Sequence, residues 1–389
     1  MNKLKIGVIG LGNMGSEHCR LLRSHQAQEV ELACVADLRK SRREWARETL
    51  PESVHVYEDG LSLIAAKTCD AVIVAVPHYQ HPELTITALD AGLHVLCEKP
   101  VAVYTAQVQP VLEAAERSGK TFALMFNQRT NCLYRRLKEI IDSGEMGPIK
   151  RMSWTITDWY RSQAYYDSGS WRATWAGEGG GVLLNQCPHQ LDLLQWLFGM
   201  PSTVRAFCHE GKWHDIEVED DVTAYLTFPG GYTGVFIAST GDLPGTNRLE
   251  VSFDRGKIVC ENGQLTRWLL PGSEEADFRT GKDAYPHPEL TPEVLETDGE
   301  NPQHIGVINA FAAHILHGTP LVAEGAEGVN ALMLSNAMHL SSWLGYPVTT
   351  PIDEELFASM LAVRAKQSRH KDTHDVTFIT DHSATGRAL

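Results

Sequence analysis

The sequence lacks any apolar run long enough to cross a lipid bilayer, and its longest apolar stretches are as short as DAVIVAVP at 70–77. A membrane-spanning helix needs about 20 apolar residues, so we expect no membrane partner. The first residues, MNKLKIGVIGLG, enter a short β-rich run and not the apolar region of a secretory signal. We therefore expect a cytoplasmic protein.

Paired cysteines are also missing, because the eight cysteines are scattered and none stands in a C-x-x-C motif. Such usage is typical of reduced thiols in a cytoplasm and not of a disulfide framework. Histidines three residues apart occur twice, but no Cys or carboxylate cluster completes a metal site with either pair, so we expect no metal. These pairs are His78 with His81 and His314 with His317. A G-x-S-x-G nucleophile motif is absent as well.

Basic residues are few for the length of the chain. Lys and Arg number 34 against 49 Asp and Glu, which gives a formal net charge of −15. Such a surface repels phosphate backbones, so we expect no nucleic-acid partner. The remaining composition, 43% hydrophobic and 21% charged, is that of a globular protein. Its 389 residues exceed what one core usually holds, and we expect two domains.

The first third of the chain alternates short apolar strands with stretches of helix length. Strands are predicted at 4–9, 30–36, 71–76, 94–97 and 121–126, with helices between them at about 13–25, 40–49, 80–91 and 104–118. Near-continuous apolar strands separated by helices are typical of a parallel sheet covered on both faces. We therefore predict an α/β fold in which residues 1–128 form a doubly wound, Rossmann-type dinucleotide-binding domain.

After about residue 128 the pattern becomes that of an α+β domain, which we place at 129–389. A helix and a long strand-like run are followed by several β-rich stretches with short glycine turns, which predicts a largely antiparallel sheet. The predicted segments are the helix at 131–142, β-rich runs at 149–160, 203–209, 221–228, 232–239, 247–253 and 257–269, an exposed excursion at 271–302, and helices at 303–317, 326–344 and 352–366. The polar last twenty or so residues are expected to be poorly ordered.

A G-x-G-x-x-G array, formed by Gly10, Gly12 and Gly15, lies between the first strand and the first helix. The first glycine permits the tight turn, the second lets the backbone approach a pyrophosphate, and the third allows close helix–strand packing. The helix N-terminus, at Asn13 and Met14, offers amide donors and a positive dipole end to the phosphates. The array predicts a dinucleotide site.

Asp37 stands at the carboxyl end of the second strand, where the ribose of such a dinucleotide would lie. Its carboxylate would accept hydrogen bonds from both ribose hydroxyls and repel a 2′-phosphate, which favours NAD over NADP. Leu38 and Arg39 follow it as further cofactor contacts. Arg39, Lys40 and Arg42 could instead receive a 2′-phosphate, although a solvated helix start is the more ordinary role for such residues.

Glu98 and Lys99, in AGLHVLCEKP, lie at the carboxyl end of a buried strand, where open α/β sheets bind their ligands. A lysine held there beside a nicotinamide could hydrogen-bond a substrate hydroxyl and stabilise charge as the hydroxyl becomes a carbonyl. Burial would lower the pKa of its ammonium group and ease proton exchange. A surface ion pair between Glu98 and Lys99 is the alternative.

Three stretches resemble the Gfo/Idh/MocA family of NAD(P)-dependent oxidoreductases, which includes glucose–fructose oxidoreductase and inositol dehydrogenase. They are GVIGLGNMG with VAD, PHYQHPELTITALDAGLHVLCEKP, and WRATWAGEGGGVLLNQCPHQLDLLQWLFGMP. The resemblance covers nearly the whole chain. It implies a C-terminal domain on an open, mostly antiparallel sheet, homodimers or homotetramers formed through that sheet, and hydride transfer at a secondary alcohol of a sugar, anhydrosugar, glycoside or cyclitol.

The resemblance also implies roles for individual residues. Lys99 matches the lysine near the nicotinamide, and His189 matches the histidine that exchanges the hydroxyl proton. Asn127 matches the residue after the last Rossmann strand that faces the active-site cleft, and Trp171 with Arg172 match a pair that approaches cofactor and substrate. With these, the cofactor-contacting positions are Val76, Pro77, His78, His81, Glu98, Lys99, Asn127, Trp171 and Arg172.

Four tryptophans fall between residues 154 and 175, interleaved with polar side chains. Flat aromatic faces beside hydrogen-bonding groups suit a sugar ring, whereas the plainer interpretation is a long loop that packs its aromatic residues against the sheet. We expect both roles. The substrate contacts are predicted to be Lys99, Asn127, Asp158, Tyr160, Arg172, Asn185 and His189.

The segment GGGVLLNQCPHQLD places Asn185, His189 and Asp192 four and three residues apart, so they are predicted to share one face of a helix. Many relatives have aspartate at the position of Asn185. An amide can orient a hydroxyl but cannot accept its proton, so His189 is the expected base and Asn185 a positioning group. Asp192 is expected to be a structural anchor, and Cys187 is given no chemistry.

Two other function classes stay open. In one, NAD oxidises a sugar transiently, a glycosidic bond is eliminated, and the reaction is redox-neutral overall. In the other, the chain is a non-catalytic regulator that responds to sugar or NAD. The presence of both Lys99 and His189 weighs against a regulator.

Overall fold

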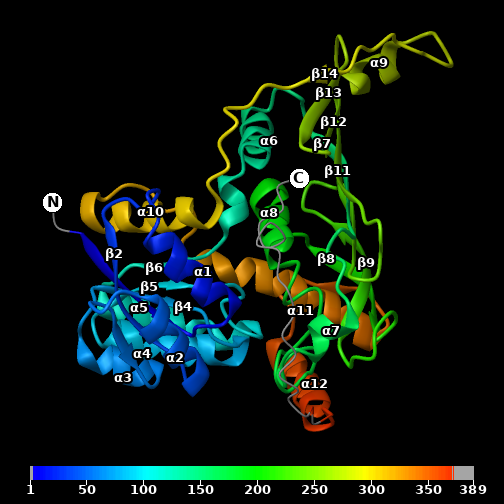
Figure 1. The fold of residues 1–389 in the computed structure, drawn as a ribbon. Coiled ribbons are helices and arrows are strands. Elements are labelled where there is room, and N and C mark those ends of the chain that lie inside the picture. The colour runs from blue at the N-terminus through cyan, green and yellow to red at the C-terminus, as the bar shows by residue number, and fades with distance from the viewer. Residues whose placement is uncertain (1–2, 370, 372–389) are drawn as a thin grey trace.

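The computed structural model describes residues 3–369 and residue 371. In this part of the chain it holds a six-stranded parallel sheet and a nine-stranded mixed sheet, which lie side by side (Figure 1). The polar residues at the end of the chain, expected to be poorly ordered, lie almost entirely outside the described residues. The two sheets confirm the predicted fold class.

The first sheet has the strand order β3-β2-β1-β4-β5-β6, and its described strand pairs run parallel. Its strands are β1 (Leu4–Ile9), β2 (Val30–Ala36), β3 (His55–Tyr57), β4 (Ala71–Val74), β5 (His94–Cys97) and β6 (Phe122–Leu124). The order reverses between β1 and β4, and open α/β sheets bind their ligands outside the carboxyl ends of the strands at such a point. This is the predicted doubly wound Rossmann sheet.

Helices cover both faces of the first sheet (Figure 1). Residues of α1 and α2 pack into one hydrophobic cluster, and residues of α3, α4 and α5 pack into the other. Their bounds are α1 (Asn13–Leu22), α2 (Lys40–Thr49), α3 (Gly60–Ala66), α4 (His81–Asp90) and α5 (Gln109–Ser118). Because both faces are covered, the strands β1, β4 and β5 are almost wholly buried, which explains their continuous apolar sequences.

The second sheet has the order β14-β13-β12-β11-β7-β10-β9-β8-β15, and its neighbours are antiparallel except at the β7–β10 pair of the described chain. Its strands are β7 (Ile149–Ile156), β8 (Thr203–Glu210), β9 (Glu219–Thr227), β10 (Thr233–Ser239), β11 (Asn247–Phe253), β12 (Gly256–Glu261), β13 (Gln264–Leu269), β14 (Glu293–Val294) and β15 (Val348–Thr349). The predicted, mostly antiparallel sheet is confirmed.

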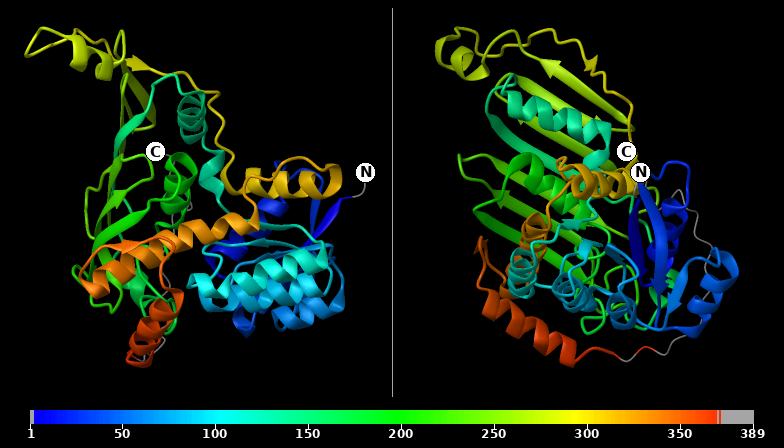
Figure 2. Two further views of the ribbon diagram at one scale, coloured as in Figure 1. Left: turned by 180° about the vertical axis from the view of Figure 1, so that it is seen from behind. Right: turned by 90° about the vertical axis from the view of Figure 1, so that its left-hand side faces the viewer.

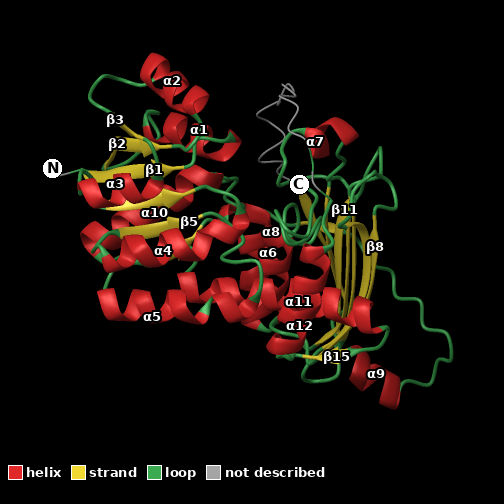
Figure 3. Cartoon of the chain, turned by 90° about the horizontal axis from the view of Figure 1, so that it is seen from below, coloured by secondary structure: helices red, strands yellow, loops and turns green. Residues whose placement is uncertain are grey.

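Helices cover one face of the second sheet and fill the space between the two sheets (Figure 3). They include α6 (Cys132–Ser143), α8 (Pro188–Phe198) and α11 (Gly328–Leu344). On the other face Phe207 and Tyr225 are 51% and 50% exposed. The strands therefore alternate between buried and exposed side chains, as β9 does, and one face of the sheet stays open.

Two details of the sheets differ from the sequence prediction. The β-rich stretch at 257–269 is a hairpin, in which Asn262 and Gly263 turn the chain with positive φ angles of 52° and 74°. Both central residues of a type I′ turn need such angles, and Asn-Gly is the usual pair. The strand β3 was not predicted, because three edge residues that are exposed or half-buried give no apolar run.

The C-terminal part of the chain returns to the first sheet before it finishes on the second. The helix α10 (Gln303–His317) buries Ile308 and Phe311 in the same hydrophobic cluster as α1, and an isolated bridge joins Ala123 to Glu324. The helix α12 (Glu354–Lys366) follows. The predicted division at residues 128 and 129 stays a prediction, and the structure adds that α10 belongs to the packing of the first sheet.

The excursion at 271–302 projects from the end of the second sheet, as expected (Figure 2). It carries the short helix α9 (Glu274–Thr280) and the strand β14, and its side chains Phe278 and Tyr285 are 86% and 80% exposed. Among the described residues, none of the helices has the length and apolarity that a bilayer crossing would need.

Candidate active site

The glycine array forms a cradle between β1 and α1. A Cβ atom on Gly10 would lie 2.4 Å from the carbonyl oxygen of Ala75, and one on Gly15 would lie 1.8 Å from the carbonyl oxygen of Gly10. No atom stands within 4 Å of a Cβ built on Gly12. The tight turn thus requires glycine at position 10, and the close packing of α1 requires glycine at position 15. Gly12, between them, leaves open space beside the N-terminus of α1. This cradle fits a pyrophosphate.

The carboxylate of Asp37 sits beside this cradle, after β2. It accepts hydrogen bonds from the backbone N–H groups of Leu11, at 2.7 Å, and Arg39, at 2.8 Å. Arg42 does not have the solvated role considered for it, because its Nε donates to the Leu11 carbonyl at 2.7 Å. Leu38 is 72% exposed at the rim. The acidic group is therefore fixed where the ribose is predicted to lie.

Replacing Asp37 by asparagine is expected to raise the ratio of NADPH affinity to NADH affinity at least about tenfold. Charge-assisted hydrogen bonds to the ribose, worth about 1.5–3 kcal/mol, weaken, and the repulsion of a 2′-phosphate disappears. Fluorescence titrations with NADH and NADPH measure this ratio. The matched control is Asp298→Asn, at an exposed carboxylate paired with Arg135. An unchanged ratio would mean that the ribose does not meet Asp37.

Lys99 follows β5 and is partly buried, and its Nζ donates a hydrogen bond of 2.7 Å to the backbone carbonyl of Asn185. Burial lowers the pKa of this ammonium group, while the charges of Glu98 and Glu178 oppose the shift. The alternative of a surface ion pair with Glu98 is wrong, because Glu98 is buried and meets the Nε2 atom of His18 at 2.7 Å. The Lys99 side chain therefore points toward Asn185, in the second domain, and not toward Glu98.

Glu98 and His18 form a buried link between β5 and α1, which the sequence analysis missed. Burial would raise the pKa of Glu98, but the hydrogen bond and charge of His18, with the charges of His304 and Lys99, lower it to about 2. The ring centroids of His18 and His304 are 5.8 Å apart. The predicted cofactor-contacting role of Glu98 thus stands beside a structural one, in which it fastens the glycine-loop helix to the strand that bears Lys99.

His189 lies in the first turn of α8, with its Nδ1 atom buried and without a hydrogen-bond partner in residues 3–369 and 371. Burial, together with the charges of Lys99 and His304, lowers the pKa of its imidazole well below the usual value. The ring is therefore neutral at neutral pH, the state in which a base accepts a proton. Lys99, after β5, and His189, on α8, thus lie close enough for the charge of the lysine to act on the imidazole.

The prediction that Asn185, His189 and Asp192 share one helix is wrong in one respect, since α8 begins only at Pro188. The preceding segment, 182–187, forms successive turns in which Cys187 N–H donates to the carbonyl of Val182 at 2.8 Å. A proline disfavours the helical conformation in the residue before it, so the helix starts at the proline. Asn185 therefore lies in the turn that approaches Lys99.

The three glycines before this turn permit close approach to both parts of the chain. A Cβ on Gly179 would lie 2.2 Å from a side-chain atom of Val103, which follows β5. One on Gly181 would lie 1.9 Å from the carbonyl oxygen of Glu219 in the second sheet. The lack of side chains at these glycines thus lets the turn fit closely between the two sheets.

Asp192 is a structural anchor, as expected. Its carboxylate forms a two-point pair with the guanidinium of Arg129, at 2.6 and 2.8 Å, and both side chains are buried. Arg129 also pairs with Glu327 at 2.7 Å. The pair joins η3 (Asn127–Thr130), which follows β6, to α8, and so fixes the helix that carries His189.

Polar and aromatic side chains surround Asn185. Tyr165, in α7 (Gln163–Asp167), donates to the Asn185 Oδ1 atom at 3.3 Å and accepts from the Arg172 Nη1 atom at 2.8 Å. The guanidinium of Arg172 lies 4.5 Å from the ring centroid of Trp171 and 4.6 Å from that of Tyr165. Trp171, Arg172 and Asn185 are all partly exposed, which suits side chains that meet a ligand.

The remaining residues are two of the clustered tryptophans and three predicted substrate contacts. Trp154 and Trp175 are 0% and 3% exposed, so these two tryptophans belong to the core. Tyr160, 41% exposed, lies on the surface after β7, and Asp158 is partly buried. Asn127, in η3, is buried and its Nδ2 donates to the Gln303 Oε1 atom at 2.5 Å. The structure does not test their substrate contacts.

The histidines after β4 have structural contacts. His78 lies in η1 (His78–Gln80), and its Nδ1 atom donates a hydrogen bond of 3.1 Å to the carbonyl of Glu178. The two ring nitrogens of His81 lie 2.8 and 2.6 Å from the carbonyl oxygens of Val76 and Pro100. The chain around Pro77 is thereby tied to the turn after β5. No group of three or more His, Cys, Asp or Glu side chains in the described ranges is placed to hold a metal.

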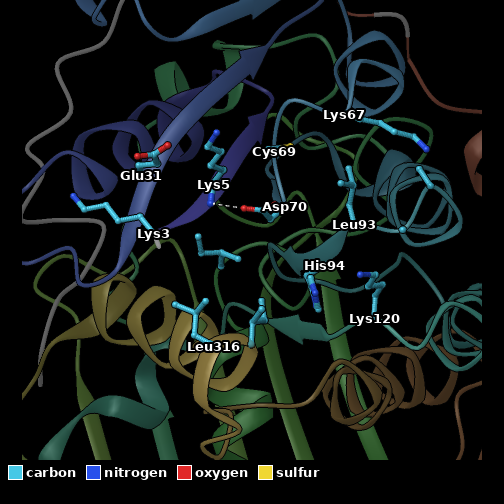
Figure 4. Close-up of a pocket in the computed structure, with 14 residues that line it drawn as sticks. Lys3, Lys5, Glu31, Lys67, Cys69, Asp70, Leu93, His94, Lys120 and Leu316 are labelled. Carbon is cyan, nitrogen blue, oxygen red and sulfur yellow. Dashed lines mark hydrogen bonds between the residues drawn. The ribbon is translucent and has the colours of Figure 1, made fainter. Parts of the chain in front are cut away.

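A depression of about 960 Å³ lies at the opposite edge of the first sheet (Figure 4). It is lined from the amino ends of the strands, among others by Lys3, Lys5, Lys67, Asp70, His94 and Lys120. None of the residues predicted for the cofactor or the substrate lines it. The candidate site is therefore the crevice at the carboxyl ends of the strands.

These features define a class of protein: an NAD-binding oxidoreductase with a Rossmann domain and a second, sheet-based domain that faces its crevice. More particularly, the chain belongs to the Gfo/Idh/MocA family. Residues 4–126 match the family model described as an oxidoreductase family with an NAD-binding Rossmann fold, and residues 134–259 match the model of the GFO/IDH/MocA C-terminal domain. The predicted family and cofactor are thereby confirmed.

Curated relatives and solved structures agree with this family. The chain is 26% identical to myo-inositol 2-dehydrogenase of Thermotoga maritima over 342 residues, which covers 86% of this chain and 95% of the relative. It is 24% identical to D-glucoside 3-dehydrogenase of Escherichia coli over 363 residues, covering 88% and 96%. The WlbA dehydrogenase of Bordetella pertussis, solved with NADH and UDP-GlcNAcA, shares the fold with a TM-score of 0.78 at 23% identity, covering 91% and 99%.

Proposed function

We propose that this oxidoreductase transfers hydride between NAD and a secondary alcohol of a sugar, anhydrosugar, glycoside or cyclitol. The observation that carries the proposal is the meeting of Lys99, from the first sheet, with the turn that precedes His189, through the hydrogen bond from Lys99 Nζ to Asn185. The similarity to inositol and glucoside dehydrogenases supports the substrate class.

NAD, when bound, accepts a hydride from the carbinol carbon. Backbone groups around Gly10, Gly12 and Gly15 and the N-terminus of α1 would hold its pyrophosphate, and Asp37 would accept hydrogen bonds from its ribose. The residues after β4 and β5 would lie beside its nicotinamide end. A substrate hydroxyl between Lys99 and Asn185 would leave its carbon facing that end.

His189 takes the hydroxyl proton in the oxidation direction, directly or through Lys99. Its low pKa keeps the imidazole neutral before the reaction, so the proton has an acceptor at the start of each turnover. The Lys99 ammonium group stabilises the oxygen as it becomes a carbonyl. Asn185 orients the hydroxyl, and Asp158, Tyr160, Arg172 and Asn127 hold the rest of the ring.

We further propose that residues 1–128 bind the dinucleotide and that residues 129–389 bind the substrate and form the oligomer. The open face of the second sheet, with its exposed Phe207 and Tyr225, supports a homodimer or homotetramer formed through that sheet. The scattered cysteines, which form no disulfide in the described part of the chain, support a cytoplasmic location.

The proposal is tested by near-ultraviolet absorbance of NADH across a panel of hexoses, anhydrosugars, glycosides and inositols, each with NAD and with NADP. We expect NADH to accumulate with NAD and at least one member of the panel. Release of an aglycone without net NADH would instead select the redox-neutral glycosidase. Tight NADH binding with no turnover of any panel member would favour a regulator.

A further inference from the structure

Glu178 is a buried carboxylate that the proposed chemistry does not use. It stands directly before the three glycines, is 2% exposed, and aims both of its oxygens at hydrogen-bond donors. Its Oε2 atom accepts from the backbone N–H of Ala173 at 2.5 Å, and its Oε1 atom accepts from the side-chain amide of Asn185. Burial raises the pKa of Glu178, while the charge of Arg172 and the hydrogen bonds from Ala173 and Asn185 oppose that shift by favouring the ionised carboxylate.

Asn185 connects this carboxylate to Lys99. Its amide nitrogen faces Glu178, its Oδ1 atom accepts from the Tyr165 hydroxyl, and its backbone carbonyl accepts from the Lys99 Nζ atom at 2.7 Å. The residue is therefore held on three sides. A substitution at Glu178 can therefore affect Lys99 through one intervening residue, Asn185.

Two carboxylates act on the charge of Lys99, and only one of them is paired with a histidine. Glu98 holds His18 by a hydrogen bond of 2.7 Å. Glu178 has no cationic hydrogen-bond partner of that kind among the contacts described for its side chain. Other charged or titratable groups also surround this pair. Near Lys99 they include Arg161, Cys187, His78, His81, His189 and His304, and near Glu178 they include Arg172, Glu219 and Tyr166.

We propose that Glu178 is a positioning residue that supplies the site with the negative charge that asparagine at 185 lacks, and that holds Asn185 against Lys99. In this chain the carboxylate stands directly before the glycines, and Asn185 lies between it and Lys99. This inference concerns the state of Lys99, and it rests on the proposed function only for its effect on turnover.

The sign of the effect follows from the charges. A nearby carboxylate stabilises an ammonium group, so its removal lowers the pKa of the lysine. In Glu178→Gln we expect the titration of Lys99 to move down by about one pH unit. In Glu178→Asp, which keeps the charge, we expect it to stay near the wild-type value. In the exchange variant E178Q/N185D, which restores one carboxylate and one amide, we expect the titration of Lys99 to return to near the wild-type value.

The titration is read without any substrate. Purified wild-type, E178Q, E178D and E178Q/N185D proteins are labelled briefly with acetic anhydride across a range of pH, and acetylation of the peptide that contains Lys99 is measured by mass spectrometry. Thermal unfolding of each variant shows that the fold is retained. Should E178Q alone not fold, the exchange variant carries the test, because it keeps a carboxylate–amide pair with the groups interchanged.

The expected order is that E178Q titrates below the other three proteins, which titrate together. The proposal is overturned if Lys99 titrates alike in folded E178Q and wild type, or if the exchange variant stays at the E178Q value. Equal shifts in E178D and E178Q would reduce Glu178 to a packing role. Once a substrate is known, the pH profile of kcat/KM should move with the labelling curve. Absence of turnover, with this order intact, counts against the proposed function alone.

Discussion

Replacing Lys99 by methionine is expected to lower kcat/KM at least about a hundredfold, while the affinity for NADH stays nearly unchanged. The methionine keeps the unbranched apolar stem but removes the group that donates to the Asn185 carbonyl and, in our proposal, to the reacting oxygen. The glycine cradle and Asp37 are untouched, so cofactor binding should persist. Steady-state rates and NADH fluorescence titrations separate the two effects.

The matched control is Lys120→Met, in the same domain but at the opposite edge of the sheet. We expect this variant to react like the wild type. His189→Ala should lose at least about a hundredfold as well, since proton transfer by a positioned base is worth that much. If both K99M and His189→Ala stayed within a few-fold of the wild-type rate, the chemistry assigned to these residues would be wrong.

Replacing Arg129 by methionine is expected to lower the free energy of unfolding by about 3–5 kcal/mol, because the variant leaves the Asp192 carboxylate buried and unpaired. The two side chains are 3% and 1% exposed and meet through two hydrogen bonds. Urea unfolding followed by circular dichroism measures the loss. The reaction should suffer too, since Asp192 sits one turn beyond His189 on α8.

Two further variants make this prediction specific. Arg135→Met removes an arginine from an exposed pair, with side chains 35% and 50% exposed, and should change stability by no more than about 1 kcal/mol. Arg129→Met combined with Asp192→Leu removes both buried charges and should recover most of the loss. An Arg129→Met protein as stable as the Arg135→Met protein would show that the buried pair does not anchor α8.

The parts of the site that could be predicted are those that depend on a short, continuous stretch of sequence. Gly10, Gly12 and Gly15 are needed by a local turn and a local packing contact, and Lys99 follows a strand that its own apolar sequence reveals. Asp37 likewise directly follows a strand. For such residues the position along the chain already fixes the position at the edge of the sheet.

The parts that could not be predicted depend on contacts that no sequence motif marks. Glu178 and Asn185 are close in sequence, yet their spacing does not indicate that the Glu178 carboxylate accepts a hydrogen bond from the Asn185 amide. His18 and Glu98 are separated by 80 positions and carry no common motif. Placing Asn185 on a helix failed because periodicity alone ignored the effect of Pro188 on the preceding residue.

The most direct test of the central claim follows hydrogen from the substrate to the cofactor. A panel substrate that supports turnover is prepared with deuterium at the carbinol carbon, and the NADH that forms is examined by mass spectrometry. We predict that the deuterium is found in the reduced nicotinamide, in an amount equal to the ketone produced. Product formation without labelled NADH, or with deuterium lost to water, would contradict direct hydride transfer at this site.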